Sequence, residues 1–270
     1  MSNQDEAAAL TRKVTALDYA GVVSRNREVF LLNYAADCRR FDLLISELQD
    51  VWFRVTRERD PKGASHLGLI LPSGILVRHC MLAFQQLVAY QSFLAWLAFR
   101  PGLEALLVAG KWVDEPSTAR IWKERDADRA LYIKTFSGEG LISASLPRSG
   151  DFRRVLGRIN DQFVHPNPNF AYRDASVREA SAKTVVFETS FFDRQAELHE
   201  AHLLAYLNLL NEIVTSCDRL VANICGSLRG SALTTADWPV SEHEAPRVKR
   251  LAEGSPVAKS IMEELGLWRF

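Results

Sequence analysis

The stretch Cys80–Phe99, with the sequence CMLAFQQLVAYQSFLAWLAF, contains no formally charged residue. It is as long as a membrane span, but its three glutamines are costly in lipid unless they find partners. Arg78 and Arg100 flank its two ends, so charge gives no preferred membrane orientation. We therefore predict a central helix that neighbouring helices bury on most sides, with its glutamines hydrogen-bonded across a bundle.

Two long amphipathic patterns lie on either side of this stretch. Apolar residues recur every three or four positions from Glu28 to Arg57, which predicts one continuous helix. A similar period from Asp193 to Cys225 predicts the longest helix of the chain, followed by Gly226 and Gly230 as its stop. Both patterns give the central helix apolar surfaces to pack against.

Shorter elements complete the prediction. Pro101–Gly102 should break the chain, and Asp151 should cap the helix that follows it. The expected short helices are Thr11–Val23, Leu103–Val108, Ser117–Phe136, Phe152–His165 and Pro256–Leu265, with a short extended segment at Thr184–Glu188. The fold class is therefore all-α, a helical bundle of about four principal helices around a buried, uncharged central helix. We expect residues 1–26 to form a loosely ordered arm, residues 27–230 the bundle, and residues 231–270 a loop and short helix.

Composition limits the classes of function. The chain has 270 residues, and Lys plus Arg equal Asp plus Glu at 33 each, so any site for a polyanion must be a local patch. The four cysteines are scattered singly, so we expect a reduced, cytoplasmic protein, and the acidic N-terminal residues predict that no signal peptide is present. No phosphate-binding loop, dinucleotide fingerprint or serine-hydrolase elbow is present, so we expect no cofactor and no membrane partner.

The segment Arg158-Ile-Asn-Asp-Gln-Phe-Val-His165 contains the residues that best suggest chemistry. At about 100° per residue, Arg154, Arg158, Asp161 and His165 share one narrow stripe opposite the apolar positions. In one interpretation this stripe is a solvated face, in which Asp161 pairs with Arg158. In the other it meets a substrate or partner, because histidine can move a proton of a ribose hydroxyl and arginine can hold a phosphate.

This segment and the residues Pro166 and Asn167 resemble the signature of the HEPN superfamily, in which an arginine precedes a histidine at the end of a helix. That superfamily is all-α and includes many RNA-cleaving toxins and defence proteins, which are typically homodimers with both Arg–His pairs in one cleft. The order of long helices over residues 28–225 is also similar. One departure is Ile159, which stands where the nucleases usually carry a polar residue.

The resemblance implies a metal-independent endoribonuclease, or at least an RNA-binding protein, that acts without a cofactor. His165 would be the general acid or base, Arg158 would bind the scissile phosphate, and Asn160 or Asn167 would orient the substrate. Arg154 would add a further substrate contact on the same helix. These roles are expectations for the five named residues alone.

Two alternatives remain open from the sequence. The first is a non-enzymatic helical module, in which residues 150–173 form a protein-binding surface. The second is a metal-binding bundle that uses His199 and His202, three positions apart on the longest helix. The position of His202 on the apolar stripe favours a core histidine, so we do not assign a metal.

Overall fold

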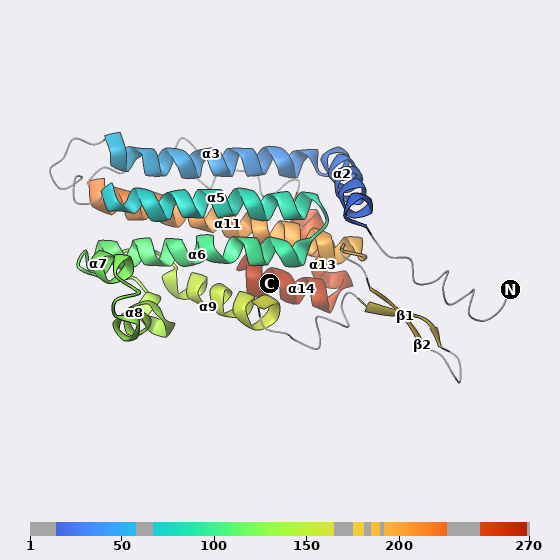
Figure 1. The fold of residues 1–270 in the computed structure, drawn as a ribbon. Helices are drawn as coiled ribbons and strands as arrows, with labels where there is room; N and C mark the ends of the chain where they lie inside the picture. Colours follow the sequence, from blue (N-terminus) through green and yellow to red (C-terminus); the bar gives the residue numbers. More distant parts are fainter. Residues whose placement is uncertain are drawn as a thin grey trace.

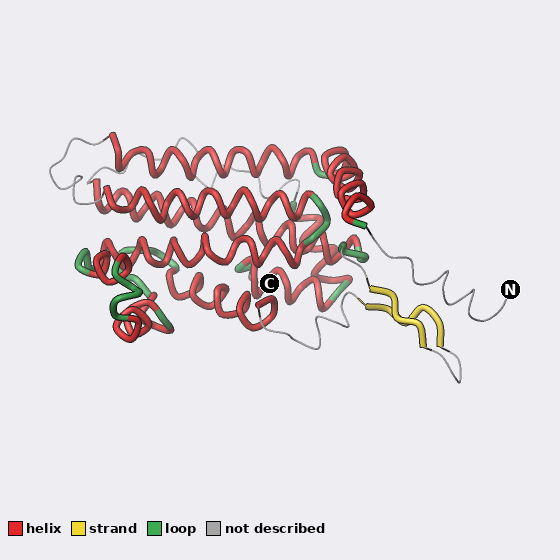
Figure 2. The backbone as a smooth tube through the Cα atoms, in the orientation of Figure 1, coloured by secondary structure: helices red, strands yellow, loops and turns green. Residues whose placement is uncertain are grey.

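The computed structural model describes residues 15–57, 67–164, 175–180, 185–189, 192–225 and 244–268. These residues form an all-α protein, with one small pair of strands to the side (Figure 2). They contain ten α-helices, so the expectation of about four principal helices is not confirmed. The long helices α3, α5, α6 and α11 run along one axis, and α9 and α14 lie against them (Figure 1).

Helix α11 (Ala196–Cys225) is the centre of the bundle, because it contacts α3, α5, α6, α13 and α14. Its buried side chains occupy all sides of the helix in the segment from His199 to Leu210. The long helix predicted from Asp193 to Cys225 is therefore present and begins three residues later than expected. The buried central helix, however, is this one and not the stretch Cys80–Phe99.

The uncharged stretch is divided between two antiparallel helices, α5 (Ile70–Val88) and α6 (Ser92–Asp114), so the prediction of one helix there was wrong. Tyr90 adopts a left-handed backbone conformation at φ 59°, which an L-residue rarely adopts. The backbone amide of Ser92, in the first turn of α6, has no partner within its own helix. It donates to the carboxylate of Asp193 (3.1 Å), 101 residues away. A cap from so distant a residue lets the chain turn without a local glycine or proline.

Pro101 and Gly102 lie inside α6, so they do not break the chain as predicted. A Cβ atom at position 102 would lie 2.9 Å from the Cβ of His79 on α5. Glycine is therefore needed here for the close contact of the two helices. The short helix expected over Leu103–Val108 is the second half of α6.

Helix α6 is long and apolar enough to cross a membrane by length and composition. Within the protein, 61% of its most apolar window is buried. A core helix passes the same test, so this property gives no separate indication of a membrane.

The helix predicted from Glu28 to Arg57 is interrupted at Tyr34, between α2 (Ala16–Asn33) and α3 (Ala35–Arg57). The apolar spacing continues across the interruption, so the pattern alone could not reveal it. A capping box of Thr15 and Asp18 begins α2, which crosses the expected boundary between an arm and the bundle at residue 26.

The other elements are short. The helix expected over Ser117–Phe136 is two helices, α7 (Thr118–Lys123) and α8 (Arg129–Phe136). The C-terminal segment adds α13 (Ala245–Gly254) and α14 (Pro256–Gly266), and α14 packs firmly on α11 through Ala258, Met262 and Leu265. Strand β1 (Ala175–Ala180) pairs antiparallel with β2 (Val185–Thr189), close to the predicted extended segment.

Candidate functional site

Helix α9 (Ser149–Ile159) carries the arginines of the sequence motif. Its apolar side chains Phe152, Val155, Leu156 and Ile159 are buried, and the helix packs on α6 and α14. The opposite face is therefore polar, as the spacing predicted. From Asn160 to Val164 the chain continues as one turn of π-helix, a form that is frequent at functional sites.

Arg154 lies on the exposed face, with 67% of its side chain accessible. Its guanidinium is 2.7 Å from Asp151, which also accepts a hydrogen bond from Arg148 (2.9 Å). Partial burial alone would raise the pKa of Asp151, but the two arginines hold it below its ordinary value. Asp151 stands in the first turn and does not cap the helix, which begins after Arg148 in a left-handed conformation, so the predicted cap was wrong.

Arg158 is half exposed, and its Nε atom lies 3.5 Å from the carboxylate of Glu264 on α14. Gln162 also donates to Glu264, at 3.0 Å. The predicted pair of Arg158 with Asp161 is not found among the described residues. A long ion pair between partly exposed groups is weak, so the guanidinium of Arg158 is available for exchange with another anion.

Asn160 is held by another helix. Its side-chain oxygen accepts a hydrogen bond from Nε of Arg100 on α6 (2.6 Å), and Arg100 also pairs with Glu104 (3.3 Å). This contact fixes the start of the π-turn against α6. Asn160 therefore has a positioning contact within the fold, which no local pattern predicted.

His165 and Asn167 lie outside the described residues. The predicted position of His165 on the stripe of Arg158 requires the rotation of a regular α-helix. Each residue of a π-helix turns by less, because its hydrogen bonds span five residues. The regular rotation therefore applies only as far as Ile159.

Comparison of the chain with protein-family models, curated proteins and solved structures found no match. Any function must therefore be argued from the residues of this chain. Two polar clusters that the sequence did not predict add to those residues.

The first unpredicted cluster joins Ser92, Asp193 and His199 beneath α2. Asp193 accepts from the hydroxyl of Ser92 (2.6 Å) and lies 2.8 Å from Nδ1 of His199. Burial alone would raise the pKa of Asp193, but hydrogen bonds from His199 and Ser92 lower it. The serine approaches the same ring nitrogen as the aspartate (3.3 Å), whereas a hydrolase triad places them on opposite nitrogens. Asp193 therefore caps α6 at Ser92, and His199 is a buried contact of Asp193 in the core. The three residues do not have the geometry of a catalytic triad.

Both histidines of the metal hypothesis are buried in α11. His202 accepts a hydrogen bond from the indole of Trp96 (3.0 Å), and His199 pairs with Asp193. Within the described ranges, no three His, Cys, Asp or Glu side chains are grouped so that they could hold a metal ion. His202 thus has the surroundings of a core histidine.

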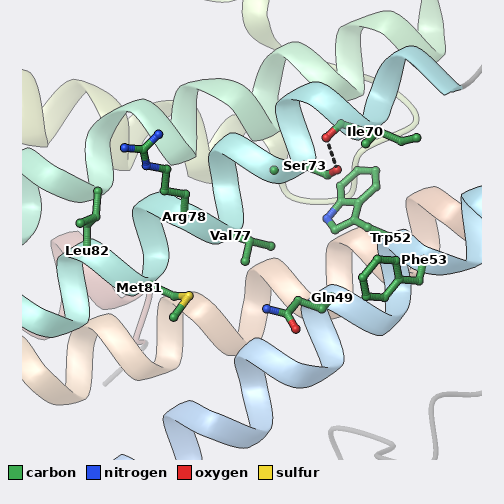
Figure 3. A pocket seen from close by; sticks show the side chains of 10 residues that line it. Gln49, Trp52, Phe53, Ile70, Ser73, Val77, Arg78, Met81 and Leu82 are labelled. Atoms are coloured by element: carbon green, nitrogen blue, oxygen red, sulfur yellow. Dashed lines mark hydrogen bonds between the residues drawn. The ribbon is translucent and has the colours of Figure 1, made fainter.

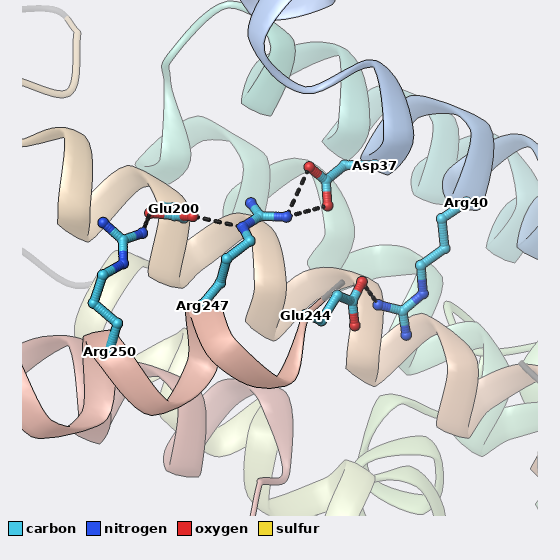
Figure 4. Close-up of polar contacts among 6 residues, drawn as sticks. All are labelled: Asp37, Arg40, Glu200, Glu244, Arg247 and Arg250. Atoms are coloured by element: carbon cyan, nitrogen blue, oxygen red, sulfur yellow. Dashed lines mark hydrogen bonds and ion pairs between the residues drawn. The ribbon is translucent and has the colours of Figure 1, made fainter. Parts of the chain in front are cut away.

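The second unpredicted group, which we call the charged cluster, consists of Asp37, Arg40, Glu200, Glu244 and Arg247 (Figure 4). Arg247 of α13 donates to Asp37 of α3 (2.9 Å) and to Glu200 of α11 (2.6 Å). Arg40 pairs with Glu244, and both are almost fully buried. Burial raises the pKa of Glu244, although Arg40 opposes this shift. The charged cluster fixes α13 to the bundle.

Proposed function

We propose that the protein binds RNA through the polar face of α9, as a HEPN-like protein. In the strong form of this proposal it is a metal-independent endoribonuclease. The observation that carries the proposal is the half-exposed guanidinium of Arg158, which has only a long contact to Glu264 among the described residues. Arginine recognises phosphate through two parallel donors, and an exposed, weakly held arginine can provide both.

The neighbouring residues support a phosphate site. Arg154 lies one helical turn before Arg158 and is more exposed. Two guanidinium groups on one face can contact successive phosphates of a single strand. The affinity should then fall as salt rises, because each neutralised phosphate releases counterions.

Cleavage would require His165 next to this face. As general base, His165 would take the proton of a ribose 2′-hydroxyl, whose oxygen attacks the adjacent phosphorus while the 5′-oxygen leaves. The products would be a 2′,3′-cyclic phosphate and a 5′-hydroxyl end, with a general acid protonating the leaving oxygen. In a homodimer the second copy of His165 would supply that acid.

A second candidate is a non-enzymatic protein-binding surface over the same face. The contact of Asn160 with Arg100 favours it, because this amide is engaged in the fold and is not free to orient a substrate. The buried Ile159 also removes the polar side chain that nucleases usually have after the arginine. In this case Arg158 would serve contacts between subunits or with a protein partner.

Fluorescence anisotropy with a labelled single-stranded RNA tests the proposal. We expect Arg158→Gln to weaken RNA binding at least fivefold. It should also reduce the slope of log binding constant against log salt concentration by about 0.7, because one phosphate contact is lost. The matched control is Arg120→Gln, on α7, whose side chain is 82% exposed and also pairs with a glutamate. Equal losses in both variants, or no binding by the native protein, would reject the RNA site.

The catalytic form needs a separate assay. His165→Ala should abolish cleavage of the RNA and leave its binding and the melting temperature nearly unchanged. Cleavage at the native rate by this variant would remove His165 from the mechanism. Binding without cleavage by the native protein would leave RNA binding alone as the function.

A further inference from the structure

A groove of about 570 Å³ lies between α3 and α5 (Figure 3), whereas α9 packs on α6 and α14. Ligand-binding pockets for small molecules typically have 300–1,000 Å³, so this volume suffices for one. The groove is lined by Gln49, Trp52, Phe53, Ile70, Ser73, Gly74, Val77, Arg78, Met81 and Leu82.

The walls of the groove are apolar and partly open to solvent. Phe53, Ile70 and Met81 are large side chains that are 44–50% exposed. Large apolar side chains that gather around one hollow mark a binding surface more often than isolated ones do. Removing them from water on binding would contribute roughly 25 cal/mol for each Å² covered.

The shape of the groove favours a linear ligand. Its lining residues on α5 run from Ile70 to Leu82, which is about 18 Å at 1.5 Å per residue. Gly74 lies between them, and a Cβ atom there would meet nothing within 4 Å. The missing side chain leaves the middle of the groove open, so one extended chain can run along α5.

Two polar groups of the groove have no partner among the described residues. The indole Nε1 of Trp52 is buried without a hydrogen bond, and Figure 3 shows it on the edge of the ring that faces Val77. Trp52 is 94% buried, so this donor has little access to water. Arg78 is exposed at the edge of the groove, and no ion pair of its guanidinium is found in the part of the chain that is described.

We propose that this groove binds a linear aliphatic carboxylate, such as a medium-chain fatty acid. The alkyl chain lies along the apolar walls between α3 and α5, and the carboxylate pairs with Arg78. The cation beside a mainly apolar hollow selects an anionic headgroup, and the open space at Gly74 leaves room for the alkyl chain. The site is independent of the RNA face, because no residue is shared between them.

Titration calorimetry with dodecanoate below its micelle concentration tests the site, with dodecanol as the neutral analogue. Gly74→Leu should abolish binding, because its side chain fills the groove. Leucine also favours a helix over glycine by about 0.8 kcal/mol, so this variant should fold. The matched control is Gly21→Leu on α2, where a Cβ atom is equally unobstructed and the groove is untouched.

Arg78→Gln should weaken dodecanoate binding about fivefold, as expected for an exposed ion pair, and leave dodecanol binding unchanged. No binding of dodecanoate by the native protein would overturn the proposal. So would equal binding by the Gly74→Leu variant, or association only with micelles and vesicles. Dodecanol bound as tightly as dodecanoate would overturn the assignment of a carboxylate.

Discussion

The arginines of the charged cluster and those of α9 form opposite kinds of contact. Arg247 is 16% exposed and donates at short distance to carboxylates from two other helices. Arg158 is 49% exposed and reaches one carboxylate at 3.5 Å. Arginine therefore stabilises the fold where water is excluded, and it remains available for a ligand where water is present.

The electrostatic reason is the cost of leaving a charge without its partner. Removing one member of a buried pair strands the other in a poorly solvated place, which costs about 3–5 kcal/mol. At an exposed pair, water and salt replace the lost partner, so the cost is about 0–1 kcal/mol. Four substitutions test this contrast.

The largest effect is expected for Arg247→Met. This change strands Asp37, removes one of the two arginine partners of Glu200, and should lower the free energy of unfolding by about 4 kcal/mol. The matched control is Arg250→Met, because Arg250 pairs with the same Glu200 but is 61% exposed. Urea denaturation at neutral pH measures both, and a loss for Arg250→Met as large as that for Arg247→Met would contradict the contrast.

Arg40→Met is expected to lower the free energy of unfolding by about 3 kcal/mol, because Glu244 would stay buried without its cation. The double change Arg40→Met with Glu244→Leu should restore most of this loss, since neither charge then needs solvation. The same denaturation experiment gives the coupling between the two positions. If the losses of the two single variants simply added in the double variant, Arg40 and Glu244 would not be energetically coupled.

Asp193→Asn should lower the free energy of unfolding by about 2 kcal/mol at neutral pH, because it weakens the cap of α6 and the contact with His199. The native carboxyl has a lowered pKa. Its stabilisation is therefore present above the ordinary pKa of 3.8 and is lost as the pH falls through the lowered value. The difference between native protein and variant should shrink below about pH 4. The control is Asp126→Asn, at a 92% exposed position, which should leave the free energy of unfolding nearly unchanged.

The smallest effect on stability is expected for Arg158→Gln, below about 0.5 kcal/mol. The same variant should still lose RNA affinity, so stability and binding separate at this residue. Thermal unfolding and anisotropy on one preparation measure the two quantities. A loss of stability as large as that of Arg40→Met would place Arg158 with the structural arginines.

Much of the fold could be predicted where helices follow local patterns. The period of apolar residues gave α11 nearly to its bounds, and Pro256 marked the start of α14. The polar and apolar faces of α9 were also correct. The missed α13 has only two buried side chains, Val248 and Leu251, so it carries a weak apolar signal.

The candidate site was predicted less completely. The exposure of Arg154 and Arg158 follows from their helical spacing. Glu264, the partner of Arg158, and Arg100, the partner of Asn160, are far away in sequence. The cluster of Ser92, Asp193 and His199 likewise joins two distant segments. No local pattern can indicate such pairs, because side-chain spacing reports only which residues share a face.

The all-α fold and the apolar face of each helix could be read from local patterns, because both depend on a period of 3.6 residues. The position at which the uncharged stretch Cys80–Phe99 turns depends on long-range contacts instead. Asp193 caps α6 there from a segment 101 residues away, and α11 takes the central place between the two halves of the bundle. The stretch Cys80–Phe99, whose pattern predicts one buried helix, is therefore a helical hairpin. At its turn the backbone hydrogen bonds of a continuous helix are lost, and Asp193 accepts hydrogen bonds from Ser92 in their place.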